Sequence, residues 1–150
     1  MSKYIGEKNY EHGSKEKIGV LITNLGTPDE PNPKALKIYL KEFLSDPRVI
    51  EVPKIIWQFI LRFFILQIRP KKSAAVYKSI WTKDGSPLLD ISNKQLSAIK
   101  FLMKDSHSNT IIKLGMRYGN PSIKDALLEL QKKQVRKLLI LPLYPQYCAA

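Results

Sequence analysis

The sequence predicts an α/β fold in which helices cover the faces of a parallel sheet. Short apolar runs rich in Val, Ile and Leu occupy residues 18–23, 110–118 and 136–143, and each has the length of a strand buried on both faces. A helical pattern at residues 121–130 lies between the last two runs. Strands that alternate with helices of this length favour parallel pairing through right-handed crossovers.

The first predicted strand, residues 18–23, ends in the turn Asn24-Leu25-Gly26-Thr27-Pro28. This turn contains one glycine, so it lacks the pattern of a dinucleotide-binding or phosphate-binding loop. Asn32 is expected to cap the next helix, with Pro33 at its first position, and the helix is expected to end before Pro47. One face of this helix is apolar and contains Leu36, Tyr39, Leu40, Phe43 and Leu44.

The middle of the chain, residues 53–105, shows no strand signal. Residues 53–68 form a helical pattern that is apolar except for a stripe of Lys54, Gln58 and Arg62. A membrane-spanning helix needs about 20 predominantly apolar residues, so this shorter segment is not expected to span a bilayer. It is expected either to pack under another domain or to lie on a membrane surface beside basic residues.

Two further helices are predicted in the same region. A new helix is expected after Pro70, with Ala74, Tyr77 and Trp81 on one face, and the turn Gly85-Ser86-Pro87 follows it. The next helix is expected from about Asp90 to Met103.

The last predicted helix opens at Asn120 and Pro121, and its inward face contains Ile123, Ala126, Leu127 and Leu130. The strand that follows, residues 136–143, is expected to be central in the sheet. The sequence ends at Ala150 before another crossover helix, so we expect an incomplete domain whose last strand is poorly covered.

The net charge of +12 is unevenly distributed. No acidic residue occurs between Glu51 and Asp84, whereas this stretch contains Lys54, Arg62, Arg69, Lys71, Lys72, Lys78 and Lys83. Such a region attracts nucleic acid, anionic lipid or a substrate that carries carboxylates. A second basic stretch, residues 131–137, is interpreted as a solvated helix face. No basic and aromatic recognition element accompanies the charge, so a nucleic-acid partner is not expected.

Residues 1–16 mix lysines and glutamates without an apolar core, so they resemble neither a signal peptide nor a transit peptide. We expect a flexible tail in a cytoplasmic protein. His12 and His107 have no Cys or Glu at ligand spacing, and Cys148 is the single cysteine, so no metal site and no Ser-His-Asp or Cys-His triad are expected.

Five segments occur in the order and spacing of landmarks in one known family. They are Asn24-Leu25-Gly26-Thr27-Pro28, Phe43 to Val49 (FLSDPRV), Tyr77 with Gly85-Ser86-Pro87-Leu88, Gly115-Met116-Arg117-Tyr118-Gly119, and Leu141 to Tyr147 (LPLYPQY). Over residues 17–150 the chain therefore resembles the amino-terminal half of ferrochelatases. The resemblance implies an enzyme of haem biosynthesis that inserts ferrous iron into protoporphyrin IX. It also implies two similar Rossmann-like domains that hold the porphyrin between them, with a helical insert at about residues 53–105.

The resemblance also implies a porphyrin site. A porphyrin is a flat apolar ring with two carboxylate tails, so it needs apolar walls and a polar or basic rim. The matching pocket positions are Leu25, Tyr77, Ser86, Arg117, Tyr144, Gln146 and Tyr147. Residues 53–68 match an apolar lip that meets membrane-borne substrate, here Trp57, Phe59, Phe63 and Phe64. In some relatives the position of Leu25 is a tyrosine that can approach the metal. Leucine cannot coordinate a metal, so its presence favours the ferrochelatases that use protoporphyrin.

The catalytic histidine and glutamate of the family lie downstream of the region matched here, so no residue of this chain is assigned a catalytic role. Metal insertion needs a base for the pyrrole protons, and the chain alone is therefore expected to be inactive. No permanently bound cofactor is expected, and the alanines after Cys148 disfavour an iron–sulfur cluster. Porphyrin and a peripheral membrane surface are the expected partners. Two alternatives stay open, namely a membrane-surface or tetrapyrrole-binding module without catalysis, and a related chelatase for another metal.

Overall fold

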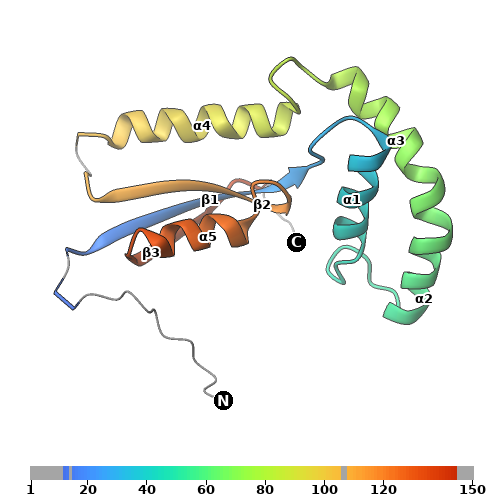
Figure 1. Ribbon diagram of the computed structural model, residues 1–150, viewed down its shortest axis with the longest axis horizontal. Coiled ribbons are helices and arrows are strands. Elements are labelled where there is room, and N and C mark those ends of the chain that lie inside the picture. Colours follow the sequence, from blue (N-terminus) through green and yellow to red (C-terminus); the bar gives the residue numbers. More distant parts are fainter. Residues whose placement is uncertain (1–11, 14, 106–107, 145–150) are drawn as a thin grey trace.

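The computed structural model describes residues 12–13, 15–105 and 108–144, and the predicted α/β class is confirmed. Three parallel strands form the sheet in this part of the chain, in the order β2–β1–β3 (Figure 1). They are β1 (Lys17–Thr27), β2 (Thr110–Gly119) and β3 (Val135–Pro142).

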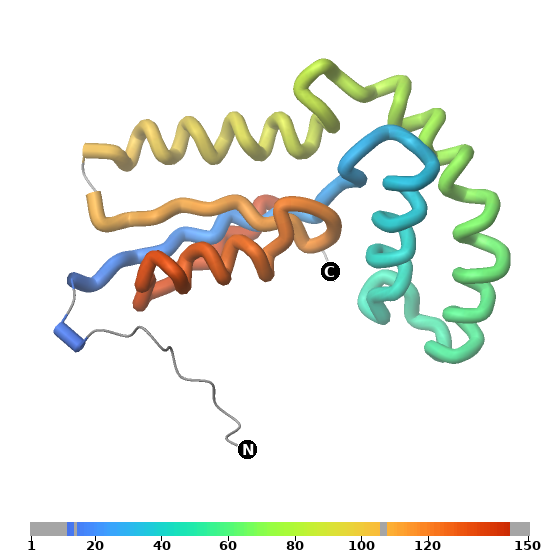
Figure 2. The backbone as a smooth tube through the Cα atoms, viewed as in Figure 1, coloured from blue at the N-terminus to red at the C-terminus, as the bar shows by residue number. Residues whose placement is uncertain are grey.

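The centre of the sheet is β1, whose two faces are covered by different helices. Leu21 packs on one face against Ala126 and Leu130 of α5 (Ile123–Lys132). Val20 and Ile22 lie on the other face, where α4 (Pro87–Met103) contributes Leu89, Leu96, Ile99 and Met103. Figure 2 shows α4 and α5 on opposite sides of the strands. Consecutive strand residues point to opposite faces, and helices cover both faces of β1. Both sets of side chains are therefore buried, which explains why this apolar run does not alternate with polar residues.

The first strand is longer than the sequence indicated, because the predicted turn at residues 24–27 continues the pairing with β2 as far as Thr27 opposite Gly119. Gly26 permits this close approach with a φ of 110°. A Cβ at this position would lie 1.8 Å from the carbonyl oxygen of Tyr118. Glycine is therefore needed here for both conformation and space.

The starts of α4 and α5 differ from the predictions. Ser86 caps α4, so this helix begins at Pro87 and not near Asp90. Ser122 caps α5, whereas the predicted start at Asn120 and Pro121 is wrong. The Pro121 carbonyl accepts a hydrogen bond from the backbone of Met116 in β2 at 2.7 Å, and this contact holds Pro121 outside the helix.

A group of helices extends beyond the carboxyl ends of β1 and β2 (Figure 1). It contains α1 (Pro33–Leu44), α2 (Lys54–Ile60), a π-helical turn η1 (Leu61–Ile65) and α3 (Leu66–Ile80). Asn32 caps α1 as predicted, because its side chain accepts from the Ala35 backbone N–H at 2.9 Å. The buried core of this group is formed by Tyr39, Leu40, Leu44, Leu61, Leu66 and Tyr118.

The predicted break at Pro70 is wrong, since α3 continues through this residue. Proline removes one backbone donor and normally kinks or ends a helix. Pro70 is buried together with Leu66 and Ala74, which lie one turn before and after it on the same face. Packing of this face against α1 supports the helix across the lost hydrogen bond.

The last strand is at the edge of the described sheet, so its predicted central position is wrong for this structure: β3 pairs with β1 alone. Leu138, Leu139, Ile140 and Leu141 are between 41 and 57% exposed. Because consecutive residues alternate between faces, both faces of β3 are partly open. The expectation of a poorly covered last strand is therefore confirmed. Leu127, predicted to face inward on α5, is also partly exposed.

Candidate functional site

Two of the candidate residues, Leu25 and Arg117, lie near the carboxyl ends of β1 and β2. Ligands of open α/β sheets bind outside the carboxyl ends of the strands. Here the helical group of α1, α2 and α3 stands beyond those ends (Figure 1). Both candidate residues are within the last residues of their strands, Leu25 in β1 and Arg117 in β2.

Leu25 and Tyr77 both lie near Tyr39. Leu25 is partly buried and packs against the core cluster that contains Tyr39. The Tyr39 hydroxyl donates to the Gly26 carbonyl oxygen at 3.2 Å. Burial raises the pKa of the Tyr39 and Tyr77 phenols above the usual value, so both stay protonated at neutral pH. Tyr77 also contacts Trp81, with ring centroids 6.3 Å apart.

Ser86 has a structural contact at the start of α4. It is buried, and its Oγ accepts from the Leu89 backbone N–H at 3.2 Å. The hydroxyl proton is left for a further acceptor. Asn24 links the same helix to β1 through its Nδ2, which donates to Ser92 Oγ at 3.3 Å.

Arg117 is held by Asp46, a residue that sequence reasoning did not select. Asp46 follows α1, and its side chain is 9% exposed in the ion pair with Arg117. Its carboxylate also accepts from the Arg48 backbone N–H at 2.9 Å and from the Tyr118 hydroxyl at 3.0 Å. These donors, the Arg48 N–H first, lower the pKa of Asp46. Burial, reinforced by Asp46, raises the pKa of Tyr118 to about 12.

The Asp46 contacts join α1 to β2 and orient the Arg117 guanidinium, which also lies 4.8 Å from the centre of the Tyr118 ring. A hollow of about 830 Å³ lies beside Arg117, and its lining includes Arg48, Lys124, the acidic Glu42 and the apolar side chains of Ile123 and Leu127. Two arginines and a lysine at the edge of an apolar hollow suit a ligand with anionic substituents. The FLSDPRV landmark contained Asp46, but only the fold shows that it holds Arg117.

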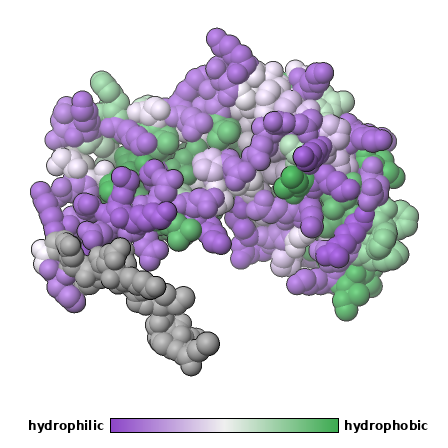
Figure 3. Space-filling model, viewed as in Figure 1, coloured by the Kyte–Doolittle hydropathy of each residue, from purple (hydrophilic) through white to green (hydrophobic). Residues whose placement is uncertain are grey.

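The lip carries exposed aromatic side chains. Phe59, Phe63 and Phe64 are 57, 62 and 56% exposed, and the rings of Phe59 and Phe63 are 4.7 Å apart. Trp57 differs, because it is partly buried and donates from Nε1 to the Leu44 carbonyl oxygen at 2.6 Å. Figure 3 shows hydrophobic side chains gathered at the end of the molecule where Figure 1 places α2 and α3. The prediction that this segment is only partly buried is confirmed.

The remaining predicted residues lie near or beyond the end of the described chain. Tyr144 is partly buried just after β3, next to Leu143, whose backbone N–H donates to the Thr23 carbonyl oxygen at 2.8 Å. Gln146, Tyr147 and Cys148 lie outside the described residues, as do most residues of the predicted tail. No group of three or more His, Cys, Asp or Glu residues able to hold a metal occurs in the described part. None of the described helices is long and apolar enough to cross a membrane.

The ferrochelatase family model matches residues 17–150 of this chain, which includes every element described above. The chain belongs to the ferrochelatase family. It is 54% identical to the ferrochelatase of Idiomarina loihiensis over 149 residues, which cover 99% of this chain and 41% of that protein. It is 56% identical to the ferrochelatase of Marinobacter nauticus over 148 residues, covering 98% of this chain and 40% of that protein. This ferrochelatase-family chain thus spans about two fifths of the length of these relatives.

Proposed function

We propose that this chain forms the first domain of a ferrochelatase, which inserts ferrous iron into protoporphyrin IX to give protohaem in haem biosynthesis. The family match over residues 17–150 is the observation that carries this proposal. In it, residues 17–150 supply a porphyrin-pocket wall and residues 53–105 a helical insert. The catalytic histidine and glutamate come from the downstream part of the family sequence, so this chain contributes binding and not the base. No iron–sulfur cluster is part of the proposal.

The geometry at the carboxyl ends of the strands supports a porphyrin site. Leu25 offers an apolar contact beside the protonated phenols of Tyr39 and Tyr77, and the Arg117 guanidinium is oriented by Asp46. A flat apolar ring with two carboxylates needs such a combination of apolar wall and cationic rim. Ser86, Tyr144, Gln146 and Tyr147 complete the proposed pocket.

The lip supports a peripheral role at a membrane, from which a poorly soluble porphyrin would enter. Its exposed phenylalanines lie on a segment whose neighbours Lys71 and Lys72 are basic and exposed. Aromatic residues beside lysines favour binding at an anionic lipid surface. We propose the same peripheral location on the cytoplasmic side.

The test is a titration of protoporphyrin IX fluorescence with the purified gene product at its complete length, followed by anaerobic addition of ferrous iron. Saturable binding and haem formation are expected. Tyr77→Ala removes a partly buried wall residue and should weaken binding about tenfold. Ile91→Ala, a change at an exposed position of α4, is the matched control and should leave the affinity unchanged.

The possible outcomes separate the alternatives. Porphyrin binding without haem formation would favour a tetrapyrrole-binding module. Insertion of another divalent metal in preference to ferrous iron would favour a related chelatase. Absence of saturable porphyrin binding would contradict the proposal.

A further inference from the structure

A second hollow lies at the opposite end of the sheet, between the carboxyl end of α4 and the outer edge of β2. It measures about 340 Å³, and we define it as the edge groove. Its wall contains Lys100 of α4, Lys104 directly after this helix, Lys113 of β2, Met103, Ile112 and Ser108. It shares none of its lining residues with the proposed porphyrin site.

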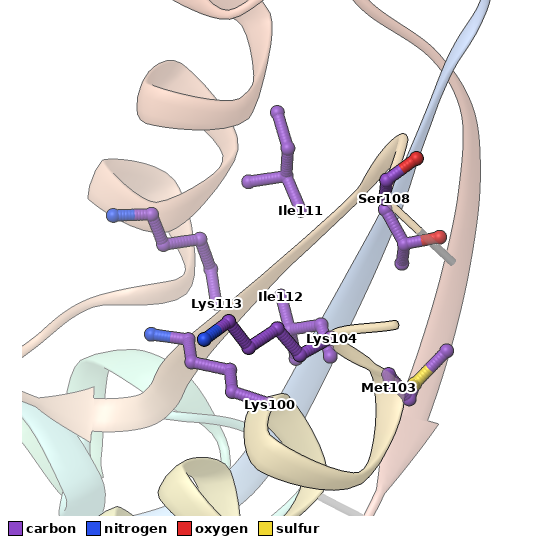
Figure 4. A pocket seen from close by; sticks show the side chains of 8 residues that line it. Lys100, Met103, Lys104, Ser108, Ile111, Ile112 and Lys113 are labelled. Atoms are coloured by element: carbon purple, nitrogen blue, oxygen red, sulfur yellow. The ribbon is translucent and has the colours of Figure 1, made fainter. Parts of the chain in front are cut away.

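Three lysine side chains line the edge groove, and Lys113 is already paired with Glu129 of α5. Lys100 and Lys104 are one helical turn apart, and Lys113 reaches the groove from the neighbouring strand. Figure 4 shows the Lys100 and Lys104 side chains close together, with Lys113 extending from the neighbouring strand. Like charges at this helical spacing repel each other, so an anion between them would offset an existing cost.

Within the described part of the chain, neither Lys100 nor Lys104 forms an ion pair. Lys113 forms an ion pair with Glu129 of α5, and within the described part of the chain this is the one ion pair that involves any of the three lysines. The negative end of the α4 dipole favours lysines in its last turn. That effect favours Lys100 and Lys104, and the ion pair with Glu129 accounts for Lys113 on its strand.

The groove also offers neutral hydrogen-bond donors. In the described sheet β2 pairs with β1 on one side only, so the backbone along its outer edge has no neighbouring strand. This edge lines the groove over residues 110–113, and the exposed Ser108 adds a hydroxyl. Lysine ammonium groups combined with backbone and hydroxyl donors are typical of phosphate binding. Met103 and Ile112 give the groove an apolar floor, which also suits an organic group attached to the phosphate.

We propose that the edge groove binds a phosphate group, carried either by a free phosphate compound or by a phospholipid headgroup. The test uses the gene product at its complete length. Inorganic phosphate is titrated calorimetrically in one arm, and vesicles of phosphatidylglycerol, with phosphatidylcholine vesicles as reference, are sedimented with the protein in the other.

The informative variant is Lys100→Gln with Lys104→Gln, and Lys34→Gln with Lys37→Gln is the matched control. The control changes the net charge equally at two exposed lysines of α1, far from the groove. The groove variant should weaken binding at least about tenfold, because charge-assisted hydrogen bonds are lost, and the control should not. Lys100→Arg with Lys104→Arg should retain binding, which separates loss of charge from misfolding.

If the groove variant binds inorganic phosphate more weakly than wild type, the ligand is a free phosphate compound. If only its binding to phosphatidylglycerol vesicles is weaker, the ligand is a lipid headgroup. Two results would overturn the proposal. One is no binding in either arm, and the other is equal weakening by the groove variant and the α1 control, which would reveal a general effect of net charge.

Discussion

At the scale of single residues, two positions make contacts that no other residue type could supply in the same way. Gly26 lets β1 and β2 approach each other at the edge where the proposed porphyrin site begins. Asp46 connects the end of α1 to Arg117 and Tyr118 of β2. Both residues join the helical group to the sheet and so fix the geometry of the site.

Gly26→Ala should destabilise the protein by about 3 kcal/mol or more, because strain at positive φ adds to a clash with the neighbouring strand. Gly85→Ala is the matched control. Its φ is 105°, similar to 110° at Gly26, but a Cβ there would meet no atom within 4 Å. The control should lower the free energy of unfolding by about 1 kcal/mol. Urea unfolding measures both values, and equal losses would show that the close approach of the strands is not limiting.

Asp46→Asn should lower the free energy of unfolding by about 2 kcal/mol at neutral pH, since charged hydrogen bonds are lost. The folded state lowers the pKa of this carboxyl, so its ionised form stabilises the fold above about pH 4. The contribution disappears as the pH falls through the lowered pKa. The difference between wild type and variant should therefore shrink toward pH 2. A difference that is constant with pH would contradict the assigned charge.

At the scale of elements, the lip combines a fixed base with an exposed surface. Trp57 attaches α2 to the end of α1, and Leu61 and Leu66 are buried beneath the exposed phenylalanines. The segment is therefore held in place while its aromatic side chains remain exposed. That arrangement separates the folding role of the lip from its proposed binding role.

Phe63→Ser with Phe64→Ser should reduce binding to anionic vesicles or the rate of porphyrin uptake, while the melting temperature changes by only a few degrees. The matched control is Ile38→Ser with Ile91→Ser, whose side chains are 62 and 54% exposed but lie outside the lip. Vesicle sedimentation, porphyrin fluorescence and thermal unfolding provide the three readouts. If the lip variant unfolds and the control does not, the lip is part of the core and has no separate binding role.

The sequence predicted the strand and helix order because apolar runs and the Asn32-Pro33 cap are local signals. It did not predict which cap is used where two are available, as at Asn120 and Ser122, because a backbone contact from Met116 to Pro121 decides between them. Pro70 was misread for a similar reason, since burial against α1 outweighs the missing donor. In the candidate site, Leu25 and Tyr77 could be selected from landmarks, whereas Asp46 became visible only when the fold placed it beside Arg117.

At the scale of the whole molecule, the uneven covering of the sheet is the dominant feature. Helices cover both faces of β1, whereas β3 exposes apolar side chains on both faces and pairs on one side. Exposed apolar edge strands favour association with other chains. The same chain spans about 40% of its relatives, which agrees with the proposal that another part of the enzyme covers this surface.

Residues 1–150 produced alone should therefore bind porphyrin weakly, form no haem and unfold with a free energy below about 5 kcal/mol. We attribute the expected low stability to the open β3 surface and the expected lack of turnover to the proposed downstream position of the base. Size-exclusion chromatography, thermal unfolding and an iron-insertion assay are the measurements. A monodisperse, cooperatively unfolding and active chain would refute both explanations.

The central claim is that porphyrin contacts the carboxyl ends of the strands and the helical group beyond them. Hydrogen–deuterium exchange of the complete gene product, with and without protoporphyrin IX, tests this claim without any substitution. The account predicts slower exchange on porphyrin binding in peptides that cover residues 23–27 and 61–81, and unchanged exchange at residues 100–113. Protection confined to α5 and β3, or no protection near Leu25 and Tyr77 at saturating porphyrin, would contradict it.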